Sequence, residues 1–282
     1  MGARRVVRVI RGRETSEGAG VRLRRTLGGP EIDHLDPFLL LDEFKSDDKD
    51  DYIAGFPDHP HRGFETVTYM LAGSMRHRDS RGNQGDLTAG SVQWMTAGRG
   101  IVHSEMPRQE HGLMWGFQLW VNLPAAEKMR EPRYQDIPPE RVPEVEPSRG
   151  VKVRVVAGRS GGVEGPVAGI VTGPLYLDVS LAAGASLEQE VPAGHNAFAY
   201  VFEGEAGIGP AEETPTRVAA GHLAVLGEGD ACVARAGERG ARALVVAARP
   251  IGEPVARHGP FVMNTREEIL QAIADFREGR LA

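Results

Sequence analysis

Residues 59–69 read His-Pro-His-Arg-Gly-Phe-Glu-Thr-Val-Thr-Tyr, a stretch that combines metal-binding side chains with the composition of a strand. On a β-strand, residues i and i+2 point to the same face, so the imidazoles of His59 and His61 can converge on one point inside a barrel. Pro60 between them has no N–H to donate, which indicates the edge or the start of a strand. We therefore expect this stretch near the mouth of a β-barrel, where a substrate can enter.

A second pair of polar side chains has the same spacing in His103-Ser104-Glu105. It places a third imidazole and a carboxylate on one face of another strand. If the two pairs face each other, they supply imidazole nitrogens and one carboxylate oxygen, which suits Fe(II), Mn(II), Ni(II), Cu(II) or Zn(II). We predict one metal ion per chain, held by His59, His61, His103 and one carboxylate, for which Glu105 is a candidate.

A further carboxylate competes for the oxygen position. Glu65 stands four residues after His61, which is the spacing of the usual cupin motif H-x-H-x₃-E. The sequence pattern alone leaves Glu65 and Glu105 open as the carboxylate ligand. A lone histidine is more often a satisfied polar residue than a ligand, so the prediction of a metal site depends on the two pairs together.

Most of the remaining sequence reads as short strands joined by turns. Its 36 glycines and 19 prolines punctuate segments rich in Val, Leu, Phe, Tyr and Thr. Helical periodicity appears only near the end, where Ile269, Ile273 and Phe276 share one face after the capping-box pattern Thr265-x-x-Glu268. We predict an all-β fold of two cupin barrels (double-stranded β-helix or jelly roll) with a C-terminal helix that buries this face.

An internal repeat indicates two copies of one fold. Four residues of the first half recur at a shift of 131 positions, where Tyr69, Gly73, Gly90 and Gly98 become Tyr200, Gly204, Gly221 and Gly229. At the same shift, the predicted ligands fall on Glu190, Pro192, Ala234 and Ala236. The second copy is therefore predicted to lack a metal site. His195 and His222 are left without partners and are assigned to surface or turn positions.

The chain length of 282 residues suits two domains of ordinary size. Glu131–Gly150 is rich in proline and charge and lacks periodicity, which predicts a surface linker. We place the boundary near residue 140. The prediction is an N-terminal metal-binding cupin domain over residues 1–139 and a C-terminal cupin domain without a metal site over residues 140–282. The segment His77–Ser80 could support the metal ligands from behind, but it is assigned to an exposed hairpin.

The charge balance argues against a dedicated nucleic-acid-binding protein, since 33 Lys and Arg stand against 39 Asp and Glu. The arginine excess in residues 1–25 could contact an acidic partner, but exposed positions on the opening strands explain it more simply. Cys232 is the single cysteine of the sequence, so no intrachain disulfide or thiolate cluster can form. With no apolar segment of signal-peptide or membrane-spanning type, we expect a soluble cytoplasmic protein that does not contact a membrane.

Several segments closely resemble the pirin family, and they fall within about residues 30–125. These segments are residues 36–44, 59–69, 77–83, 92–105 and 118–124. Pirins are two-barrel cupin proteins that bind a metal, usually iron, in the N-terminal barrel. The resemblance implies His59, His61, His103 and Glu105 as ligands, and it favours Glu105 over Glu65. The second half of the chain is similar only in outline.

The resemblance implies two alternative functions. Several pirins act as quercetin 2,3-dioxygenases, so the first interpretation is an iron-dependent enzyme that opens a flavonol such as quercetin with O₂, with Glu105 as general base. Animal pirins are transcriptional co-regulators and some bacterial pirins bind metabolic enzymes, so the second is a non-catalytic, iron-binding regulatory protein with a protein partner. An open cavity with apolar walls would favour the enzyme, and a narrow, sealed pocket would favour the regulator.

Overall fold

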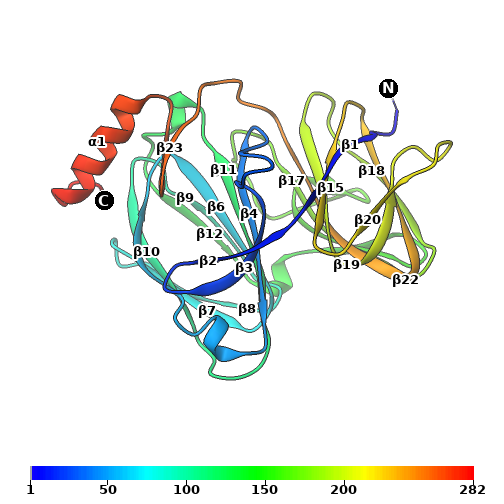
Figure 1. The fold of residues 1–282 in the computed structure, drawn as a ribbon, viewed down its shortest axis with the longest axis horizontal. Coiled ribbons are helices and arrows are strands. Elements are labelled where there is room, and N and C mark those ends of the chain that lie inside the picture. Colours follow the sequence, from blue (N-terminus) through cyan, green and yellow to red (C-terminus); the bar gives the residue numbers. More distant parts are fainter. Residues whose placement is uncertain (1) are drawn as a thin grey trace. The chain divides into compact units, whose positions relative to one another are not determined.

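Short antiparallel β-strands make up most of residues 2–282, the part of the chain that this computed structural model describes (Figure 1). The chain separates into two compact units. Residues 14–139 and 251–282 form the first barrel, and residues 2–13 and 140–250 form the second barrel. The predicted all-β fold with a C-terminal helix is confirmed.

The first barrel consists of two antiparallel sheets and a small hairpin. Its strands are β2 (Arg13–Glu17), β3 (Val21–Leu27), β4 (Phe38–Ser46), β5 (Phe56–His61), β6 (Phe64–Ala72), β7 (Ser74–Asp79), β8 (Gln84–Thr88), β9 (Val92–Thr96), β10 (Ile101–Pro107), β11 (Met114–Asn122), β12 (Arg133–Ile137), β23 (Ala256–His258) and β24 (Phe261–Met263). Its helical elements are the 3₁₀ turns η1 (Lys49–Asp51) and η2 (Ala125–Glu127) and the helix α1 (Arg266–Arg277), while the 3₁₀ turn η3 (Pro139–Arg141) spans the division between the two units.

The strand order of the larger sheet is β12-β9-β6-β11-β4-β3-β2, and that of the smaller sheet is β5-β10-β7-β8. One buried apolar cluster joins the two sheets, with Leu23 and Phe44 from the larger sheet against Met75 and Leu87 from the smaller. Each strand contributes alternate side chains to this interior because side chains on a strand alternate between its faces. The interior is therefore fixed by residues that are far apart in the sequence.

The turn between β5 and β6 follows directly after the two histidines of β5. Gly63 in this turn has a φ of +90°, in the left-handed region that favours glycine. A Cβ atom here would collide with the carbonyl oxygen of Val262. The buried Nζ of Lys128 donates to the carbonyl oxygens of Gly63 at 2.8 Å and Val262 at 3.0 Å, and to Oδ1 of Asn122 at 2.6 Å. These contacts hold the turn against β24.

The second barrel is built around two long strands, β19 and β22. The strands of this unit are β1 (Val6–Arg11), β13 (Glu144–Ser148), β14 (Val151–Ala157), β15 (Arg159–Ser160), β16 (Val163–Glu164), β17 (Leu175–Leu181), β18 (Ser186–Glu190), β19 (Asn196–Ile208), β20 (Thr216–Ala219), β21 (His222–Leu226) and β22 (Ala231–Ala248). The strand order of its main sheet is β1-β21-β19-β22-β17-β14-β13, while β18 pairs with β22 and β20 pairs with β19. β15 and β16 form a separate two-stranded sheet. Ala234 and Ala236, the counterparts of His103 and Glu105, are buried in its apolar core.

The ends of the chain are exchanged relative to the predicted domains. The two compact units divide between residues 139 and 140, and residues 2–13 and 251–282 each group with the unit at the other end of the sequence. β1 pairs antiparallel with β21 in the second barrel, whereas β23, β24 and α1 belong to the first barrel. Strand pairing between distant segments decides this arrangement, and a division by sequence position cannot anticipate it.

The region Glu131–Gly150 is more ordered than the predicted linker. It contains β12, which pairs with β9, and β13, which pairs with β14. The backbone hydrogen bonds of these strands are satisfied within sheets. The sequence has little periodicity here and did not indicate the strands. The prediction of an unstructured surface linker was therefore wrong for these strands.

The C-terminal helix begins as predicted but buries a narrower face. Thr265 and Glu268 form both hydrogen bonds of the capping box at the start of α1. Ile269 is buried in a cluster with residues of β24, Ile273 is half-buried and Phe276 is 42% exposed. The prediction that Phe276 is buried was wrong. No helix within residues 2–282 has both the length and the apolar composition of a membrane span.

Candidate metal centre

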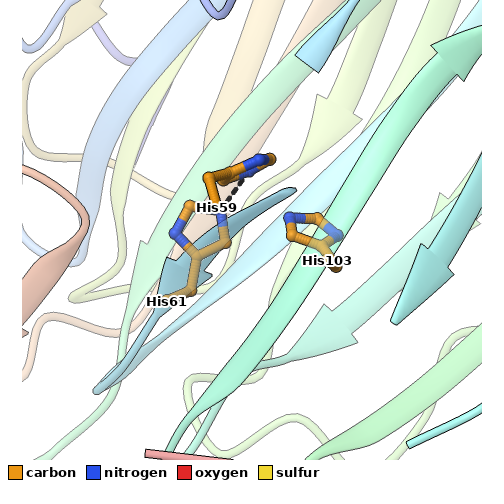
Figure 2. Close-up of side chains that lie close together, drawn as sticks. All are labelled: His59, His61 and His103. Atoms are coloured by element: carbon orange, nitrogen blue, oxygen red, sulfur yellow. Dashed lines mark hydrogen bonds between the residues drawn. The ribbon is translucent and has the colours of Figure 1, made fainter. Parts of the chain in front are cut away.

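Three histidines from two paired strands come together inside the first barrel (Figure 2). β5 carries His59 and His61, and β10 carries His103, which lies directly opposite His59 in the antiparallel register. One ring nitrogen from each lies within 4.8 Å of the others. The ring centroids are 4.4 Å apart for His59 and His103 and 5.0 Å apart for His61 and His103. This spacing allows the three imidazoles to bind one metal ion.

Burial keeps two of these imidazoles in the form that binds metal. His61 and His103 are 2% and 1% exposed, and burial lowers the pKa of both well below the usual histidine value, with further lowering from the neighbouring histidines. Both rings are therefore neutral at pH 7, as metal ligands must be. Among residues 2–282, neither ring nitrogen of His103 has a hydrogen-bond partner. A bound cation would satisfy such a buried nitrogen, so the residues fit a metal ion.

Glu105 lies on the same strand as His103 and is 2% exposed. Its Oε1 is 2.9 Å from the hydroxyl of Thr68, and its Oε2 accepts a hydrogen bond from Nε2 of Gln118 at 3.1 Å. A register shift in the pairing with β5 falls between His103 and Glu105. The carboxylate is therefore oriented by two neighbours beside the histidines, although the 4.8 Å group consists of the histidines alone.

Glu65 is held in a different place by different partners. Its Oε2 accepts a hydrogen bond from Nε1 of Trp94 at 3.1 Å, and its Oε1 accepts one from the hydroxyl of Thr96 at 2.6 Å. Both donors belong to β9, and the carboxyl group is 1% exposed. Burial raises the pKa of Glu65. With both oxygens engaged by β9, Glu65 joins β6 to β9, while the histidines lie on the other sheet.

His77 is buried, and the prediction of an exposed hairpin was wrong for it. The residue is 1% exposed and lies in β7 opposite Glu105 of β10. Its ring stacks on Tyr134 with 5.5 Å between centroids, and its Nε2 is 3.5 Å from Oδ2 of Asp136. A local sequence pattern could not show these contacts, because Tyr134 and Asp136 belong to β12, which is far from β7 in the sequence. The spacing of His77 and Asp79, again i and i+2, was a usable signal.

A cavity of about 500 Å³ opens beside the histidines in the first barrel. Its apolar wall contains Leu23, Leu40, Phe44, Phe56, Met75 and Trp120. Its polar lining includes His59, His61, Thr68, Glu105, Gln118, Arg25, Asp42 and Arg257. A volume of this size accommodates a small organic molecule, and a mainly apolar wall with a few polar groups is typical of ligand sites.

Two β-barrels in one chain, with convergent histidines in one of them, define a bicupin protein with a candidate metal centre. The family models of pirin and of the pirin C-terminal cupin domain match residues 20–121 and 176–282. The chain belongs to the pirin family.

Relatives of known name extend over the whole chain. A Pseudomonas aeruginosa protein, provisionally named quercetin 2,3-dioxygenase, is 51% identical over 99% of this chain and 98% of its own length. Human pirin is 48% identical over 99% of this chain and 94% of its own length. A solved structure of quercetin 2,3-dioxygenase from Acinetobacter baumannii has a TM-score of 0.90 and 33% identity, and the match covers 100% of this chain and 99% of that chain.

Proposed function

We propose that this chain is a metal-dependent dioxygenase that cleaves a flavonol such as quercetin, with the metal held by His59, His61, His103 and Glu105. The observation that carries the proposal is the cavity of about 500 Å³, with apolar walls, that His59 and His61 of the histidine group line. Such a cavity can hold a planar aromatic substrate next to the metal. The names of the Pseudomonas and Acinetobacter relatives support the same reaction.

When bound, a divalent metal ion, iron(II) in this proposal, supplies the Lewis acid and the redox partner that a reaction with O₂ requires. The protein positions the substrate and supplies a base. Glu105 faces the cavity and is oriented by Thr68 and Gln118, so it can accept the proton of the flavonol 3-hydroxyl while staying beside the histidines. The apolar side chains Phe56 and Met75 line the same cavity as Glu105.

The alternative is a non-catalytic, iron-binding regulatory protein that binds a protein partner. A regulator needs the metal but has no need of a substrate-sized space. The apolar cavity beside the histidines therefore favours the enzyme.

Oxygen uptake tests the proposal. Iron-loaded wild-type protein is expected to consume O₂ with quercetin, and the metal-free protein is expected not to. Glu105→Gln should lower the rate about 100-fold or more, because an amide cannot act as the base. Iron-loaded protein that consumes no O₂ with quercetin or related flavonols at neutral pH would support the regulator instead.

A further inference from the structure

One wall of the cavity carries a guanidinium group that makes no direct ion pair among residues 2–282. Arg257, in β23, lines the cavity and is half-buried. Its Nη1 donates to the carbonyl oxygen of Leu39 at 3.2 Å. Within residues 2–282 it forms no ion pair with a carboxylate, which leaves its remaining donors available to a ligand.

A second arginine on the same wall is fully neutralised. Arg25 donates from Nε and Nη2 to the two carboxylate oxygens of Asp42 at 2.8 and 2.7 Å, and its Nη1 is 2.9 Å from Glu17. Burial, and next the positive charge of Arg25, lower the pKa of Arg257, while the charges of Asp33, Asp42 and Glu17 act in the opposite direction without forming an ion pair with it. An anion beside Arg257 would relieve both effects, because it would supply the counter-charge that Arg25 already has.

An aromatic surface connects this guanidinium to the candidate metal centre. The guanidinium carbon of Arg257 lies 5.0 Å from the centroid of the Trp120 ring. The same ring packs against Phe64 at 4.4 Å between centroids, and its edge-on contact with His61 is at 5.3 Å with the rings at 77°. A molecule that reaches the histidines through the cavity can therefore contact Trp120 on the way and present its far end to Arg257.

We propose that Arg257 determines substrate specificity by binding an anionic oxygen at the end of a planar aromatic substrate remote from the metal. The inference rests on the proposed function, because that function places the reacting end of the substrate at the histidines and so sets the orientation of the substrate. The preferred substrate class is a hydroxylated aromatic compound that carries a phenolate or carboxylate at the opposite end. Trp120 lines the path between the histidines and Arg257, and Arg257 selects the charge of the substrate.

Binding of a matched ligand pair tests this role without turnover. The probes are flavone 4′-carboxylate and its methyl ester, which both lack the 3-hydroxyl group. Each is titrated into the metal-loaded full chain by calorimetry under anaerobic conditions. Wild-type protein should bind the carboxylate at least about ten-fold more tightly than the ester, as expected for a charge-assisted hydrogen bond. Arg257→Gln should remove this preference, and Arg257→Lys should keep part of it.

The controls separate this role from a structural one. Arg235→Gln removes an exposed positive charge from the second barrel and should leave the preference unchanged. A change in thermal stability alone cannot imitate a change in the ratio of two affinities. Equal binding of both probes by wild-type protein, failure of both to bind, or a preference that survives in Arg257→Gln would overturn the inference. A preference without oxygen uptake on quercetin would refute the dioxygenase and leave the inference standing.

Discussion

At the residue scale, hydrogen bonds distinguish the two buried carboxylates of the first barrel. Glu105 lies close to Thr68 and Gln118, and all three residues line the cavity beside the histidines. Glu65 has its two oxygens engaged by the side chains of β9. The spacing of Glu65 after His61 fits the usual cupin motif, but the contacts of its side chain give it a structural role that joins β6 to β9.

Matched substitutions are expected to separate these two roles. Glu65→Gln should keep the metal and lower the free energy of unfolding by about 1–2 kcal/mol, because one amide oxygen replaces two carboxylate acceptors. Glu105→Gln should lower oxygen uptake far more than metal content. Elemental analysis and chemical denaturation of both variants measure these effects. Loss of metal in Glu65→Gln, with full retention of activity in Glu105→Gln, would reverse the assignment.

Lys128 predicts a pH dependence of stability. Burial lowers its pKa from 10.5 to about 8, so between these values the unfolded chain binds more protons than the folded chain. Stability from this group therefore rises as the pH increases from about 8 to 10.5, by up to about 3 kcal/mol. Denaturation of wild-type protein and Lys128→Met across this range measures the difference. A difference that stays flat would contradict the prediction.

Some residues of the candidate site could be predicted from the sequence, and others could not, because their positions depend on strand pairing. The alternation of side chains along a strand brought out His59, His61 and His103, since it depends only on neighbours in the sequence. The burial of His77 and the partners of Glu65 depend on which strands pair, and a local pattern does not contain that information. Arg257 comes from the far end of the chain and had no signal near the histidine motif.

At the element scale, α1 illustrates the limit of periodicity. Ile269, Ile273 and Phe276 share a face by spacing, and the capping box fixed the start of the helix. The width of the buried face depends on the surface opposite. Residues of β24 cover Ile269, whereas the Phe276 ring contacts Phe261 at 6.3 Å between centroids and stays largely exposed.

Two alanine substitutions in α1 should therefore have unequal effects. Ile269→Ala removes a buried side chain and is expected to lower the free energy of unfolding by about 2–4 kcal/mol. Phe276→Ala removes a ring that is 42% exposed and should cost about 1 kcal/mol or less. Urea denaturation of both variants gives the comparison. Equal losses would indicate that the helix packs differently.

At the scale of the whole molecule, each barrel has its own core, and each is completed by a segment from the distant end of the chain. β1 lies at the edge of the second barrel, with Arg4 donating to the carbonyl oxygens of His195 and Gly227 at 2.8 and 3.0 Å. The turn-rich texture and the repeat predicted two barrels, because they reflect local composition. The exchange of the termini depends on long-range pairing and could not be predicted in the same way.

Removal of residues 2–13 is expected to destabilise the second barrel by exposing the edge of β21 and the partners of Arg4. The metal content should not change, because the histidines lie in the other unit. Thermal unfolding combined with elemental analysis distinguishes the two effects. Loss of the metal together with the strand would show that the units are not independent.

The central claim is that one metal ion is bound by the histidines of the first barrel. Elemental analysis of metal-loaded protein tests it directly, with wild-type protein compared with His59→Ala and with His222→Ala as the matched control in the second barrel. The account predicts one equivalent of metal per chain for wild-type protein and His222→Ala, and loss of most of it for His59→Ala. Two equivalents in wild-type protein, or full retention in His59→Ala, would contradict it.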